Sequence, residues 1–78
     1  MTKAQARYIV MHHDGQWKIN LDNRYYGPCT SREAAVDMAI DTARKAVSGG
    51  YAASVLVMEG GQFERVWSSE EEARGTVG

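Results

Sequence analysis

The sequence predicts a small α+β domain in ββαββ order, in which a single helix packs on one face of an antiparallel sheet. Three two-residue breaks, Asp14-Gly15, Asp22-Asn23 and Gly60-Gly61, interrupt short runs of β-branched, aromatic and aliphatic residues. Such pairs tolerate the positive φ angles that a two-residue hairpin turn requires. One alanine-rich segment lies between the second and third breaks. We therefore expect extended runs toward both ends of the chain and one helix between them.

The extended runs before the helix are short. Tyr8–His12 is the first, and Trp17–Leu21, which alternates apolar and polar residues, is the second. The Asp22-Asn23 turn leads into Arg24–Tyr26, the shortest run. We expect Gly27-Pro28 to end it, because proline has no N–H to donate to a neighbouring strand.

The alanine-rich segment carries the start and stop signals of a helix. Thr30 and Glu33 have the spacing of a capping box, in which each side chain satisfies a free backbone N–H. Gly49-Gly50 supplies the left-handed stop, and Met38 falls on the predicted solvent side. The predicted apolar stripe comprises Val36, Ile40, Ala43 and Val47, widened by Ala35, Ala39 and Ala46.

A second hairpin follows the helix. Ala53–Met58 is a continuous apolar run, typical of a strand covered on both faces, and Gly60-Gly61 returns the chain as Gln62–Trp67. We predict a flexible N-terminus over residues 1–5, a single α+β domain over residues 6–68 and a flexible acidic tail over residues 69–78, with at most one frayed helical turn in the tail.

The two N-terminal turns also predict which side chains share a face. Two-residue turns place Val10 opposite Ile19 and Ile19 opposite Tyr26, and directly opposed residues lie on one face. The helix should cover this core face. It carries Tyr8, Val10, His12, Trp17, Ile19, Leu21 and Tyr26.

One helix leaves the other face of the sheet uncovered, so we predict an exposed apolar patch that serves as an interface. For so small a chain a homodimer is the simplest occupant, and an unidentified protein partner is the other. In the C-terminal hairpin Leu56, Met58, Phe63 and Trp67 share one face while Val55, Val57 and Val66 share the other, and the sequence leaves open which face meets the helix. The predicted interface residues are Ile9, Met11, Tyr25, Val55, Val57 and Val66.

Composition limits the classes of partner. The 78 residues suffice for one domain, and 9 basic against 10 acidic residues give a net charge of −1, which argues against strong charge-driven binding to nucleic acid or membrane. We find no apolar stretch long enough for a signal peptide or a membrane span. Cys29 is the only cysteine and cannot pair within the chain. We therefore expect a reducing compartment, the cytoplasm.

Three groups of residues suggest chemistry. His12, His13 and Asp14 resemble metal ligands, but neighbouring strand residues point to opposite faces, so we expect no metal and no cofactor. Cys29 lies just before the helix, where a thiolate is stabilised, which keeps a thiol-active protein as an alternative. Nucleophilic catalysis also needs a base within reach, and the sequence places none there, so we do not expect an enzyme.

The third group consists of Arg7, Lys18 and Tyr25, which share the uncovered face. Cations interleaved with aromatic rings are typical of surfaces that bind single-stranded nucleic acid. A weak single-stranded nucleic-acid-binding module is therefore a second alternative. The favoured interpretation is a small non-enzymatic interaction or accessory protein that associates with itself.

The order of motifs adds a resemblance. The motifs concerned are Asp14–Ile19, Thr30–Ala35, Ala43–Lys45, Val55–Val57 and Gly60–Phe63. In this order they resemble a family of short bacterial domains of unknown function, with a Gly-x-Trp hairpin, an alanine-rich helix and a glycine-turned C-terminal hairpin. The chain is also similar to the YegP-like proteins. That resemblance implies units that pair as dimers or tandem repeats, and it implies no catalytic residues.

Overall fold

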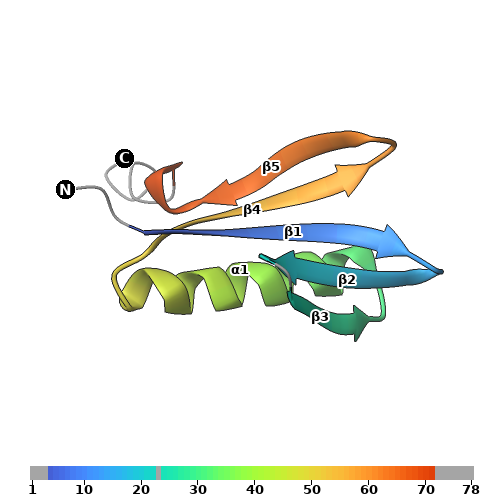
Figure 1. Cartoon of the computed structure of the whole chain (residues 1–78), viewed down its shortest axis with the longest axis horizontal. Helices are drawn as coiled ribbons and strands as arrows, with labels where there is room; N and C mark the ends of the chain where they lie inside the picture. The colour runs from blue at the N-terminus through green and yellow to red at the C-terminus, as the bar shows by residue number, and fades with distance from the viewer. Residues whose placement is uncertain (1–3, 23, 72–78) are drawn as a thin grey trace.

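The computed structural model describes residues 4–22 and 24–71. Within these residues the chain forms five strands and one long helix (Figure 1). The elements are β1 (Gln5–His13), β2 (Gln16–Leu21), β3 (Arg24–Cys29), α1 (Arg32–Ser48), β4 (Ala52–Glu59) and β5 (Gln62–Ser68). The strands form one sheet in the order β3-β2-β1-β4-β5, and α1 runs along one side of it. The α+β class and the single helix are as predicted.

Two details of the predicted architecture are wrong. The order is βββαββ rather than ββαββ, because the short run predicted over Arg24–Tyr26 forms a full edge strand, β3. The sheet is mixed rather than antiparallel, because β4 pairs with β1 in parallel. Two antiparallel hairpins in succession point β3 the same way as β1. The helix then carries the chain back across the sheet, so the next strand starts again in that direction and lies parallel to β1.

The strand at the β3 edge is longer than predicted. It continues through Gly27-Pro28 to Cys29, which lies opposite Trp17 after a shift in register. A bulge at a sheet edge tolerates proline, since the missing N–H falls outside the regular ladder. The proline therefore does not end the strand.

The two-residue turns are confirmed as hairpin turns. Asp14 and Gly15 have φ angles of 54° and 74°, and Gly60 and Gly61 have 57° and 77°. The paired residues are Tyr8–Leu21, Val10–Ile19, His12–Trp17, His13–Gln16, Ile19–Tyr26 and Leu21–Arg24, as the turns predict. Local turn chemistry therefore determines the register of the first three strands.

The boundaries of the domain differ slightly from prediction. Gln5 is the first residue of β1 and pairs with Ala52, whose N–H donates to the Ala4 carbonyl at 2.9 Å, so the flexible N-terminus predicted over residues 1–5 is wrong at its last residues. Residues 69–71 are helical. The remainder of the predicted termini, residues 1–3 and 72–78, lies outside the described residues.

The helix begins one residue later than the capping-box pattern predicts. The N-cap is Ser31, whose Oγ accepts a hydrogen bond from the Ala34 N–H at 3.1 Å, so the predicted cap at Thr30 is wrong. The glycine pair ends the helix as predicted. Gly50 adopts a φ of 98° and donates to the Val47 carbonyl at 3.0 Å.

This difference in capping predicts unequal effects of two neighbouring substitutions. Ser31→Ala removes the acceptor for a free N–H of the first turn and should lower the free energy of unfolding by about 1 kcal/mol. Thr30→Ala is the matched control and should be nearly neutral. Urea denaturation of both variants measures the difference, and equal losses would contradict the assignment of the cap to Ser31.

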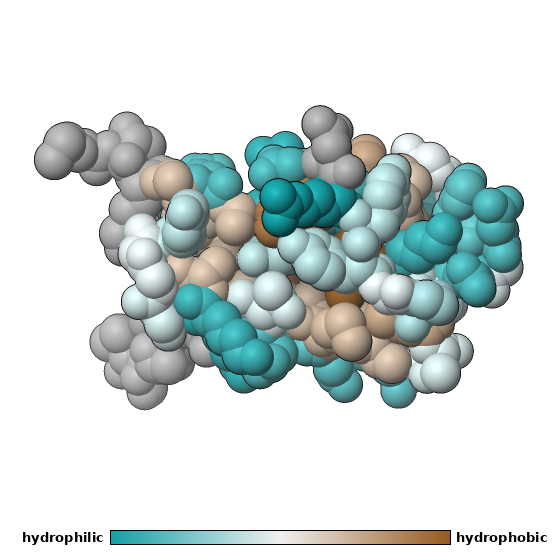
Figure 2. All heavy atoms as spheres, turned by 60° about the horizontal axis from the view of Figure 1, so that its bottom comes forward, coloured by the Kyte–Doolittle hydropathy of each residue, from teal (hydrophilic) through white to brown (hydrophobic). Residues whose placement is uncertain are grey.

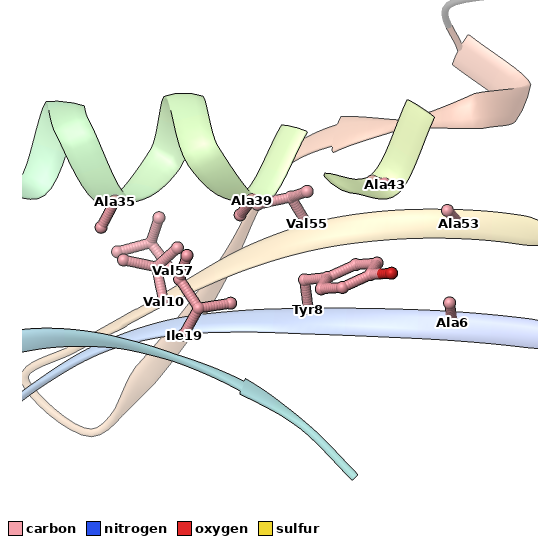
Figure 3. Close-up of a cluster of buried hydrophobic side chains, with 10 residues drawn as sticks. All are labelled: Ala6, Tyr8, Val10, Ile19, Ala35, Ala39, Ala43, Ala53, Val55 and Val57. Carbon is pink, nitrogen blue, oxygen red and sulfur yellow. The ribbon is translucent and has the colours of Figure 1, made fainter. Parts of the chain in front are cut away.

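The core lies between α1 and the three central strands. Its buried members are Ala6, Tyr8, Val10, Ile19, Ala35, Ala39, Ala43, Ala53, Val55 and Val57 (Figure 3). The helix contributes only alanines, while branched and aromatic side chains come from the sheet. Small side chains bring the helix axis close to the sheet and leave room for the valines and Ile19 beneath it.

The helix is rotated relative to the predicted stripe. Ala35, Ala39 and Ala43 form its buried centre, whereas Val36 and Ile40 pack at its margins and Val47 is exposed. Two further members of the predicted core face, His12 and Tyr26, share that face but are exposed. They lie beyond the reach of the helix, near the end of β1 and on the edge strand β3.

Burial of Tyr8 should make the fold less stable at alkaline pH. Burial, with a smaller effect of the nearby Tyr26, raises the pKa of the Tyr8 phenol above its usual 10.0. The phenol ionises more easily in the unfolded chain, so its contribution is complete below pH 10.0 and is lost as pH rises above that value. The urea concentration at the unfolding midpoint should decrease as pH rises above 10.0, and this decrease should be smaller in Tyr8→Phe. Tyr51→Phe, at an exposed position, is the control and should leave the decrease unchanged. The same pH dependence in Tyr8→Phe as in the parent would contradict the account.

Candidate interaction surface

The face of the sheet opposite α1 is the candidate functional surface, and we call it the open face. Side chains alternate between faces along a strand, so the neighbours in sequence of the buried Val10, Val55 and Val57 point away from the helix. The registers extend this assignment to all five strands. The open face carries Arg7, Ile9, Met11, Lys18, Asn20, Tyr25, Ser54, Leu56, Met58, Phe63 and Arg65.

One row of side chains crosses the whole open face. It contains Tyr25, Asn20, Ile9, Leu56 and Arg65, one residue from each strand in spatial order. The next row places Met11 beside Met58 and Met58 beside Phe63. These rows bring together a group that we call the apolar centre. It consists of Ile9, Met11, Leu56, Met58 and Phe63.

The apolar centre is incompletely covered. Ile9, Met11, Leu56 and Met58 are half-buried by their neighbours in the sheet, and Phe63 is 58% exposed. Figure 2 turns the lower edge of Figure 1, with β3 and α1, toward the viewer, and this surface mixes hydrophilic with weakly hydrophobic residues. The members of the apolar centre adjoin one another on the open face, whereas other exposed large side chains lie elsewhere, with Tyr26 on the helix side of the sheet and Met38 and Val47 on α1.

The open face carries the residues predicted for an interface on β1 and β3, and not those predicted on β4 and β5. Ile9, Met11 and Tyr25 lie on the open face. Val55 and Val57 are 0% and 1% exposed beneath the helix, and Val66 packs against the core at the β5 bulge. The apolar residues of the open face that sequence reasoning did not assign to the uncovered side are Leu56, Met58 and Phe63. The feature that assigns them to the open face is the parallel register of β1 and β4, in which Tyr8 aligns with Val55 and Ile9 with Leu56.

Charge is unevenly divided between the two faces. Arg7, Lys18 and Arg65 lie on the open face, and Arg65 pairs with Glu71. Glu59 and Glu64, the acidic residues of the five strands, lie on the helix side, where both contact Arg32. Arg7 and Lys18 have no ion-pair partner among the residues that the structure describes. The strand positions of the open face are thus cationic at the margin and apolar in the centre.

The residues considered for metal or thiol chemistry do not converge. The His12 ring packs on Trp17 with centroids 4.9 Å apart, while His13 Nδ1 lies 3.4 Å from Asp14 Oδ2 at the exposed turn. Within residues 4–22 and 24–71 the structure holds no group of three histidine, cysteine or acidic side chains suited to a metal ion. Cys29 is half-buried and packs against the core.

Two shallow hollows adjoin Arg7 on the open face. One, of about 230 Å³, lies between the start of β1, β4 and the turn after β5, and its polar lining includes Ser54, Arg65 and Glu70. The other, of about 320 Å³, is lined by Gln5, Arg7, Ile9, Asn20 and Asp22. Neither lining includes a histidine or a cysteine. Both hollows suit contacts to a polar partner at the margin of the face.

Comparison with protein-family models, with curated proteins and with solved structures found no match to this chain. The resemblance to short bacterial domains and to YegP-like proteins stays a prediction. In the part of the chain that the structure describes, no helix has the length and apolar character needed to cross a bilayer.

Proposed function

We propose that this chain is a non-enzymatic interaction module that associates with a second copy of itself through the open face. The observation that supports the proposal is the apolar centre, Ile9, Met11, Leu56, Met58 and Phe63, on the face that α1 leaves uncovered. Removing apolar surface from water contributes about 25 cal/mol per Å². Phe63 and its neighbours therefore favour association over exposure.

Several features favour a second copy as the occupant. Two sheet faces pack well against each other at about 10 Å, and a two-fold arrangement places the same apolar centre on both sides. The apolar centre contains no charged side chain, so self-packing brings no like charges together there. Arg7 and Lys18 lie on the β1–β2 side and stay at the margin of such a dimer.

The size of the open face predicts a reversible dimer. Five strands spaced about 4.8 Å apart and paired over about six residues present roughly 500 Å² per copy. The total, on the order of 1,000 Å², lies at the small end of specific interfaces. We expect dissociation at low micromolar concentration. We place this function in a reducing compartment such as the cytoplasm, because Cys29 is the only cysteine and forms no disulfide within the chain.

The proposal is tested by light scattering coupled to gel filtration, from low micromolar to millimolar protein. The apparent mass should rise from the 8.6 kDa of one chain toward twice that value. A mass that stays at one chain across the whole range would refute self-association.

A further inference from the structure

A second part of the open face has a different chemistry from the apolar centre, and we call it the cationic flank. It consists of Arg7, Lys18, Asn20 and Tyr25, from β1, β2 and β3. Asn20 lies directly opposite Tyr25, and the Asn20 amide donates to the Arg24 carbonyl at 3.3 Å. The ring of Tyr25 is 62% exposed, the largest exposed fraction among the large hydrophobic and aromatic side chains described.

Along the strands, the two cations lie on either side of the row that holds the aromatic ring. Lys18 lies opposite Met11, and Arg7 lies four residues from Met11 on the same face, so roughly 13 Å separates them along the strands. The row that contains Asn20 and Tyr25 lies midway between them. Since Arg7 and Lys18 have no ion-pair partner among the described residues, both charges are available to an anionic ligand.

The local charge of the cationic flank differs from the net charge of the chain. The acidic residues of the helix, Glu33, Asp37 and Asp41, belong to an element packed on the opposite face of the sheet. Of the two hollows beside Arg7, one has Asp22 as its carboxylate, at the turn beyond the end of β2, and the other has Glu70, after β5. The cationic flank is locally positive toward Lys18, although the chain as a whole carries −1.

We propose that the cationic flank binds single-stranded nucleic acid, with a base stacked on Tyr25 and backbone phosphates beside Lys18 and Arg7. An exposed ring on the edge strand, with cations on the two neighbouring strands, matches the combination that holds unpaired nucleic acid, in which bases stack on aromatic side chains and phosphates meet cations. Asn20 lies beside the ring and offers an amide to the edge of the base. An acidic peptide would use the cations and leave the Tyr25 ring without a partner.

The cationic flank lies beside the apolar centre on the same face, and the two proposals have separate readouts. It is tested by the fluorescence anisotropy of a labelled oligothymidylate at low salt. Tyr25→Ala should weaken binding roughly tenfold, the loss expected for one stacked base. Lys18→Gln and Arg7→Gln should each weaken binding and reduce its salt dependence by about one released ion.

Matched controls come from the same chain. Tyr26→Ala alters the neighbouring aromatic residue on the opposite face, and Lys45→Gln removes an exposed cation of the helix; both should bind like the parent. Circular dichroism confirms the fold of each variant. The proposal is overturned if the parent gives no anisotropy change at low salt, if the controls weaken binding as much as Tyr25→Ala, or if polyglutamate or a duplex competes as well as the single strand. Light scattering of Tyr25→Ala should still show the dimer. Loss of nucleic-acid binding can therefore be told apart from loss of self-association.

Discussion

Replacing Ala39 with leucine is expected to destabilise the fold by about 3 kcal/mol, the largest effect of any single substitution considered for this chain. Ala39 is fully buried at the centre of the contact between α1 and the sheet. A leucine there needs space already filled by side chains such as Val55 and Val10, so the helix must move away from the sheet. For a domain of this size, such a loss is a large fraction of the total stability.

The matched control is Met38→Leu, at the adjacent helical position. Met38 is 48% exposed on the solvent side, so this change should stay within about 0.5 kcal/mol of the parent. Thermal and urea denaturation measure both variants. A leucine at position 39 that leaves the denaturation midpoint unchanged would contradict the close approach of helix and sheet.

Placing a charge in the middle of the open face is expected to abolish the dimer and leave the domain folded. Leu56 lies in the central row, between Ile9 and Arg65. It is half-buried in a single chain, so glutamate there can reach water until a second copy covers it. Burial of a carboxylate in the interface is costly even beside Arg65, which already pairs with Glu71, so we expect association to weaken more than tenfold.

Met38→Glu is the control for the added charge, because Met38 is exposed on the helix, away from the open face. Light scattering should show one chain for Leu56→Glu and a concentration-dependent mass for Met38→Glu. Circular dichroism should show the parent's helix and sheet content in both. A dimer that survives Leu56→Glu would place the interface elsewhere on the molecule.

Sequence reasoning was strongest where structure depends on neighbouring residues. Asp14-Gly15 and the positive φ at Asp22 determine the register of β1, β2 and β3, and that register separates His12 from His13 and puts Ile9 and Met11 on one face. The glycine stop after α1 is equally local. Each of these features depends on backbone angles that only a few residue types favour.

The errors lie where two choices look alike in sequence. Thr30 and Ser31 are both suitable caps, and only the path of the chain from β3 selects Ser31. A helix with alanines on several sides allows more than one buried stripe, and close packing on the sheet selects Ala35, Ala39 and Ala43.

The residues of the open face on β4 could not be chosen from sequence for the same reason. Pairing of β4 with β1 joins residues more than forty positions apart, and no turn records its register. The continuous apolar run Ala53–Met58 can present either Val55 and Val57 or Leu56 and Met58 to the helix. The parallel alignment with β1 chooses the valines for the core and leaves the larger side chains on the open face.

The most direct test of the central proposal, that the open face meets a second copy, is the concentration dependence of amide chemical shifts in ¹⁵N-labelled protein. From low micromolar to millimolar concentration, we expect shifts at Ile9, Met11, Leu56, Met58 and Phe63, and unchanged amides along the solvent side of α1. Shifts confined to the helix or to the β3 edge, or a spectrum that does not change while the mass stays at one chain, would contradict the proposal.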